Sequence, residues 1–76
     1  MSDIFIRARS IQRALGNPTD NSPAQELKLG GSREGEPFAL IRAEWVREGD
    51  AWSTWVQILQ LSPDAQVTVV FPQLAA

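Results

Sequence analysis

The stretch from residue 37 to 61, PFALIRAEWVREGDAWSTWVQILQL, constrains the fold most, because it holds all three tryptophans of the chain. Two apolar-rich runs flank a polar turn, Arg47-Glu48-Gly49-Asp50. This pattern predicts a β-hairpin. A three-residue loop over 48–50 would place Val46 opposite Trp52, Arg42 opposite Val56 and Leu40 opposite Ile58.

The second half of this stretch also fits an amphipathic helix. Trp52, Trp55, Val56 and Leu59 recur at helical spacing, and Asp50 stands where it would cap the first turn. Composition favours a strand, because Trp, Thr, Val and Ile suit a pleated surface better than a helix. We therefore predict a strand here, with a helix as the alternative.

The N-terminal segment, from Ser2 to Gly16, is predicted to be one helix. An apolar stripe recurs at a period near 3.6 residues, formed by Ile4, Ala8, Ile11 and Leu15. Ser2 would cap this helix, and Gly16 before Asn17-Pro18 would end it. Its polar side carries Arg9 and Arg13, which form either a solvated face or a contact surface for an acidic partner.

The remaining segments read as short strands and turns. Residues 24–29 predict an edge strand, 30–36 a flexible loop, and 62–65 a type I turn with Pro63 at its second position. The loop has Glu36 and Pro37 where a phosphate-binding P-loop needs Lys and Ser or Thr, which argues against nucleotide binding. Residues 66–71 predict a strand with Val67, Val69 and Phe71 on one face, and 73–76 a tail.

These elements predict a single α+β domain over residues 1–76, with one N-terminal helix packed on a three- to four-stranded antiparallel meander. In a meander, the strand at 66–71 lies at the edge of the sheet and exposes unpaired backbone groups. Such an edge is expected to pair with a strand of another chain. The alternative is that residues 24–29 pair with it and close the sheet.

Composition excludes several chemistries. The chain has no cysteine and no histidine, which removes disulfides, thiol nucleophiles, histidine bases and nearly every transition-metal site. We expect no cofactor, no metal and no enzymatic activity, and we interpret Glu44 beside Arg42 as a structural ion pair rather than an acid–base dyad. No apolar run approaches a membrane span and no signal peptide is evident, so we expect a cytoplasmic protein.

The surplus of apolar residues points to protein–protein interaction, because both faces of the central hairpin carry tryptophan and aliphatic residues. We expect a self-associating subunit or a regulator that docks onto a larger protein, and the size also suits an inhibitor encoded by a phage or mobile element. The alternative is a single-stranded nucleic-acid-binding module with a basic helix and exposed tryptophans, although the net charge is −2. The candidate partner-binding residues are Trp45, Trp52, Trp55, Val67, Val69, Phe71, Arg9 and Arg13.

Overall fold

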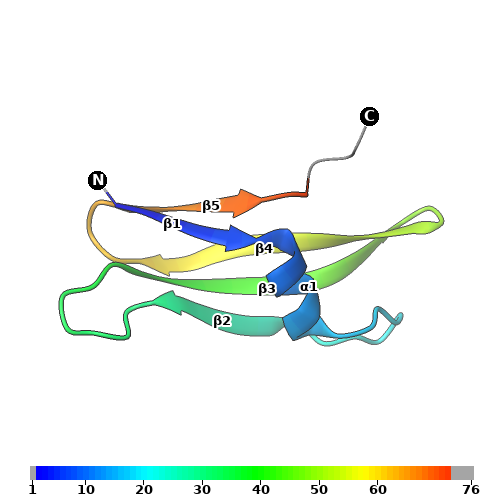
Figure 1. The fold of residues 1–76 in the computed structure, drawn as a ribbon. Coiled ribbons are helices and arrows are strands. Elements are labelled where there is room, and N and C mark those ends of the chain that lie inside the picture. The colour runs from blue at the N-terminus through cyan, green and yellow to red at the C-terminus, as the bar shows by residue number, and fades with distance from the viewer. Residues whose placement is uncertain (1, 73–76) are drawn as a thin grey trace.

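The central hairpin is the largest element of the structure (Figure 1). The computed structural model describes residues 2–72, so the predicted tail at 73–76 lies outside the described residues. Strand β3 spans Phe38–Glu48 and strand β4 spans Ala51–Leu61, and the two pair antiparallel. The strand interpretation of the second half is confirmed, and the helical alternative is wrong.

The register of this hairpin differs from the prediction by one residue. Glu48 faces Ala51, so the loop contains only Gly49 and Asp50. Gly49 has a φ of 64° and Asp50 has no positive φ, the pattern of a type II′ turn, whose twist matches that of the flanking strands. Consequently Val46 faces Ser53 and Arg42 faces Gln57, instead of Trp52 and Val56.

A β-bulge interrupts the hairpin near its far end. Ile41 faces Ile58, but Leu40 faces Gln60, so Leu59 is an extra residue on β4. The predicted pairing of Leu40 with Ile58 is therefore wrong by two residues. A bulge of this kind bends the strand and reverses the alternation of its side chains beyond that point.

Strand β2, Gln25–Gly30, pairs antiparallel with β3 and completes a three-stranded sheet in the order β2-β3-β4. The predicted short edge strand is therefore confirmed.

The loop between β2 and β3 is held by its own hydrogen bonds. The Gly31 N–H donates to the Pro37 carbonyl at 3.1 Å. The Glu36 carboxylate accepts from the Ser32 hydroxyl at 2.9 Å and from the Arg33 N–H at 3.0 Å. These two bonds, that from Ser32 first, lower the pKa of Glu36 below its usual value.

Only the second half of the predicted N-terminal helix is helical. Ser2–Arg7 is a strand, β1, and the helix α1 spans Ala8–Leu15. Residues of β1 alternate between half-buried and exposed, with Ile4 and Ile6 facing inward. Arg7, not Ser2, occupies the N-cap position, and its side chain makes no capping bond. The predicted end at Gly16 is confirmed, since the Gly16 N–H donates to the Gln12 carbonyl at 3.0 Å.

The last strand, β5, spans Ala65–Val70 and pairs parallel with β1, with Ile4 facing Val67 and Ile6 facing Val69. The predicted strand at 66–71 is therefore present within an α+β fold, but it is not the fourth strand of an antiparallel meander. The alternative pairing with residues 24–29 is also wrong. The turn before β5 keeps its predicted position, with the Ala65 N–H donating to the Ser62 carbonyl at 3.2 Å. Asp64 has a φ of 62°, which makes the turn type II rather than type I.

The fold thus has two layers, with the β1-β5 pair and α1 covering one face of the three-stranded sheet (Figure 1). Ile11, Ile41 and Ala43 are buried between the layers. Partly buried side chains surround them: Ile6, Leu15, Leu27, Leu29, Val56 and Val69. Because β1 packs over β2 and β5 packs over β3, the outer strand β4 is the least covered part of the sheet.

Candidate interaction surface

Exposed apolar side chains gather on β4. Within residues 2–72, seven large hydrophobic residues are exposed, and four of them belong to this strand: Trp55 at 58%, Ile58 at 46%, Leu59 at 44% and Leu61 at 37%. We call these four side chains, together with the unpaired edge of β4, the β4 surface. The other three exposed hydrophobic residues, Phe5, Val70 and Phe71, lie on or next to β1 and β5.

The β4 surface is apolar on both faces of the sheet. Trp55 faces Glu44 across the hairpin, on the side away from the core, whereas Ile58 faces the buried Ile41 on the core side. Leu59 lies in the bulge between the two regular parts of the strand. Apolar side chains therefore border the edge above and below the backbone.

No charged residue interrupts β4, because Ala51–Leu61 reads AWSTWVQILQL. The opposite edge strand, β2, carries exposed Glu26 and Lys28. Natural sheets commonly use charged side chains to prevent edge-to-edge pairing. Of the two edges of this sheet, only β2 has that protection.

The backbone of β4 presents unpaired groups along its outer side. Residues that flank a two-residue hairpin loop form a hydrogen-bonded pair, and the residues directed at the partner strand then alternate. With Glu48 and Ala51 as the flanking pair, the N–H and C=O groups that point away from β3 belong to Trp52, Thr54, Val56 and Ile58. In the described part of the chain, no strand pairs with this side of β4.

Two of the three tryptophans predicted to bind a partner are less exposed than Trp55. Trp45 is half-buried, and its Nε1–H donates to the Gly16 carbonyl at 3.0 Å, so it fastens the end of α1 to β3. Trp52 is also half-buried, and the Arg47 guanidinium lies 6.0 Å from its ring centroid.

The predicted residues of β5 divide between two environments. Val67 and Val69 are half-buried and face inward opposite β1, and Val69 packs against the core. Val67 and Val69 lie on one face as predicted, but the predicted unpaired edge of this strand is wrong, because β1 pairs with β5. Phe71 is 68% exposed.

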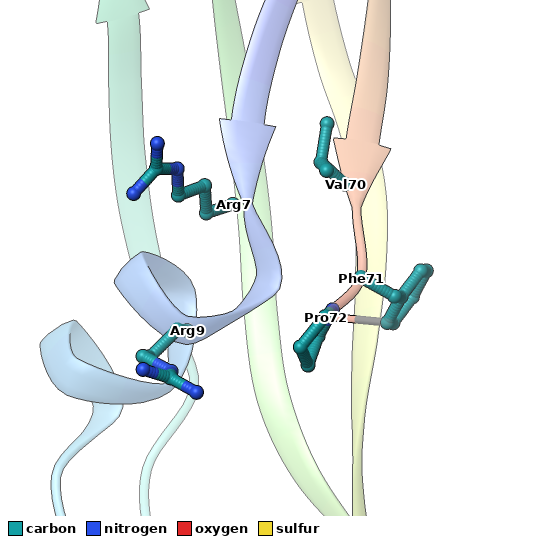
Figure 2. Close-up of a pocket in the computed structure, with 5 residues that line it drawn as sticks. All are labelled: Arg7, Arg9, Val70, Phe71 and Pro72. Atoms are coloured by element: carbon teal, nitrogen blue, oxygen red, sulfur yellow. The ribbon is translucent and has the colours of Figure 1, made fainter. Parts of the chain in front are cut away.

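Arg9 and Arg13 are both exposed on α1 and line a shallow hollow together with Trp45. Arg9 also contributes to a second hollow of about 260 Å³, where β1 and β5 end (Figure 2). Its lining residues are Arg7, Arg9, Val70, Phe71 and Pro72. The structure thus brings Arg9 close to Phe71, whereas Trp52 and Trp55 lie on opposite faces of β4.

Ile58, Leu59 and Leu61 were not among the residues predicted to bind a partner, although all three are exposed. The signal that was present is the uncharged run from 51 to 61 at the end of a hairpin. Arg7 was missed as a lining residue because residues 2–7 were predicted to be helical.

Other classes of site have little support in residues 2–72. The predicted ion pair is present, with Arg42 Nη1 at 3.1 Å from Glu44 Oε1, and both side chains are about one-third exposed. Within these residues, no cluster of acidic side chains has the arrangement of a metal site, and no helix has the length and apolarity needed to cross a bilayer. Comparison with known proteins gives no significant match to a family, a curated protein or a solved structure.

Proposed function

We propose that this protein is a small, non-enzymatic protein–protein interaction module that binds through the β4 surface. The observation that carries this proposal is the coincidence of an unpaired, uncharged sheet edge with four exposed hydrophobic side chains on one strand. Main-chain hydrogen bonds along such an edge supply affinity for an incoming strand, and the flanking side chains supply specificity.

The apolar side chains on β4 are large enough to drive binding. Trp55 exposes 58% of its surface. A tryptophan side chain buries about 150–250 Å² when fully covered, so covering the exposed part at about 25 cal/mol/Å² would contribute about 2–4 kcal/mol before entropic costs. Ile58, Leu59 and Leu61 add to this along the same edge.

The test compares the wild type with two single-residue variants. Leu59→Lys places a charge on the β4 surface, and the matched control Phe5→Lys changes another exposed hydrophobic residue, 65% exposed, on β1. Sedimentation velocity reports self-association, and quantitative pull-down from a lysate of the source cells reports binding to other proteins.

We expect Leu59→Lys to weaken whatever association the wild type shows, because it adds a charge at the end of the β4 surface, while Phe5→Lys leaves that association unchanged. Two results together would overturn the proposal. The wild type would be monomeric, and every protein that it captures from the lysate would be captured equally by Leu59→Lys.

A second candidate function, single-stranded nucleic-acid binding, has one specific observation in its favour. Arg7, Arg9 and the exposed ring of Phe71 line the same hollow (Figure 2). Arginine side chains can hold the backbone of a single strand while an exposed aromatic ring stacks on a base, although the Phe71 ring points away from the Arg7 guanidinium in Figure 2. The test is an anisotropy titration with a labelled oligonucleotide at several salt concentrations. Binding that weakens steeply with salt and is lost in Arg7→Ala/Arg9→Ala would favour this function.

A further inference from the structure

We propose that the partner of the β4 surface is a second copy of this chain, and this inference rests on the proposed function. In the proposed dimer, β4 pairs antiparallel with β4 of the second copy around a two-fold axis at Trp55. The two three-stranded sheets then form one continuous six-stranded sheet. An interface of this kind is isologous, with the same residues contributed by both copies.

The backbone of β4 fixes where the axis lies. The outward-pointing groups belong to Trp52, Thr54, Val56 and Ile58, a set centred on Trp55. A two-fold axis at Trp55 pairs Trp52 with Ile58 of the second copy and Thr54 with its Val56, so all four residues join the new ladder. Moving the axis toward the end of the strand would bring the bulge at Leu59 into the ladder, and moving it toward the loop would shorten the ladder.

The side chains suit the same register. Trp55 occupies the non-hydrogen-bonded centre of the new pair, where opposing Cα atoms approach to about 4.5 Å and side chains are closest. The two indoles, each 58% exposed in the single chain, would cover one another. On the core-facing side, Trp52 would cover the exposed Ile58 of the second copy.

Polar residues also find suitable partners in this arrangement. Ser53 lies on the same face as Trp55 and would oppose Gln57 of the second copy, whose amide can both donate and accept hydrogen bonds.

Charge favours a second copy as the occupant. Around a two-fold axis, a charged residue near the centre of a strand is placed close to its own copy, and like charges opposite each other destabilise a sheet. From Ala51 to Leu61 there is no charged residue, so self-pairing meets no repulsion within the ladder. The neutral strand also offers no charge for attracting an oppositely charged foreign strand.

Disulfide trapping tests the axis directly, because the chain contains no cysteine and any disulfide in a single-cysteine variant joins two copies. Trp55→Cys puts two cysteines at a Cα separation of about 4.5 Å, within the range that disulfides accept. Ser53→Cys and Gln57→Cys are the matched controls on the same face. Each control cysteine would lie about 14 Å from its own copy, four residues along the strand.

Under mild oxidation we expect Trp55→Cys to form a covalent dimer at least tenfold more than either control alone. An equimolar mixture of Ser53→Cys and Gln57→Cys should form the heterodimer, since these residues face each other across the interface. Sedimentation of the cysteine-free wild type is run in parallel, and we expect a dimer.

A wild-type dimer whose mixture of Ser53→Cys and Gln57→Cys, which keeps Trp55, forms no disulfide-linked heterodimer would overturn the axis at Trp55 but leave the interaction module standing. A wild type that stays monomeric at high concentration would overturn the second copy as partner. The lysate capture with Leu59→Lys then decides the proposed function independently.

Discussion

Ile41 and Ile58 provide a matched pair for testing how the two layers are held together. They face each other on neighbouring strands and point to the same side of the sheet, yet Ile41 is fully buried and Ile58 is 46% exposed. Changing each to alanine removes the same atoms from two environments that differ mainly in burial.

The expected losses follow from that difference. Truncating a buried isoleucine to alanine costs about 2–5 kcal/mol, from lost transfer energy and from the cavity that remains. Ile41 lies at the centre of the core beside Ile11 and Ala43, so we expect a loss of about 3.5 kcal/mol. Ile58 keeps half its surface in water and leaves no enclosed cavity, so we expect about 1 kcal/mol. For a domain of this size, total stability is about 4–11 kcal/mol, so Ile41→Ala removes a third or more of it.

Urea unfolding followed by tryptophan fluorescence measures both variants. The protein is kept dilute, because association through β4 would add stability that depends on concentration. In thermal melts, Ile41→Ala should lower the midpoint by about 14–28 °C and Ile58→Ala by less than about 8 °C. Equal losses in the two variants would refute the reasoning, because β4 would then be covered as fully as β3.

Two further predictions concern the loop after β2 and the end of α1. Gly30 has a φ of 70° and a Cβ there would overlap the Pro37 carbonyl, whereas Gly35 has a φ of 82° and open space. Gly30→Ala should therefore cost about 2–4 kcal/mol and Gly35→Ala only about 1–2 kcal/mol in urea unfolding, and equal costs would contradict the overlap. Trp45→Phe removes the hydrogen bond to the Gly16 carbonyl and should cost about 1 kcal/mol in the same assay, and an unchanged stability would show that this bond is not needed.

Local sequence patterns predicted the features that depend on nearby residues. The hairpin over 37–61, the loop after residue 30 and the end of the helix at Gly16 each have turn or cap signals within a few residues. The exact register of the hairpin was harder to predict, because it depends on whether the loop contains two or three residues. Gly49 accepts the positive φ of a two-residue type II′ turn, which shifts the pairs between the loop and the bulge by one residue, and the bulge at Leu59 shifts the pair of Leu40 by one more.

The error at the N-terminus has a non-local cause. Ile4, Ala8, Ile11 and Leu15 fit a helical period because the inward side of β1 and the inward side of α1 follow one another along the chain. The strand at 2–7 has its pairing partner about 60 residues later, in β5, which runs parallel to it. Periodicity within a short window contains no information about such a partner.

Only part of the candidate site could be predicted, because the rest of it also depends on contacts between residues far apart in the sequence. Exposure of Trp55 follows from strand alternation on the edge strand β4, whereas the exposed Phe71 lies one residue beyond the end of β5, outside the alternation that turns Val67 and Val69 inward. The inward orientation of Val67 and Val69 depends on the second layer, which the predicted single sheet does not contain. Because β5 pairs with β1 and not with β4, the outer edge of the three-stranded sheet is β4.

Hydrogen exchange along β4 is the most direct test of the central claim, that this edge pairs with a second copy. The outward-pointing amides on β4 belong to Trp52, Thr54, Val56 and Ile58, and none of the strands described between residues 2 and 72 pairs with them. The amides of Ser53, Trp55 and Gln57 already point toward β3. Raising the protein concentration should slow exchange of the first set selectively, giving an alternating pattern along one strand. Exchange rates of the first set that do not change with concentration, or a slowing confined to β5, would contradict the account.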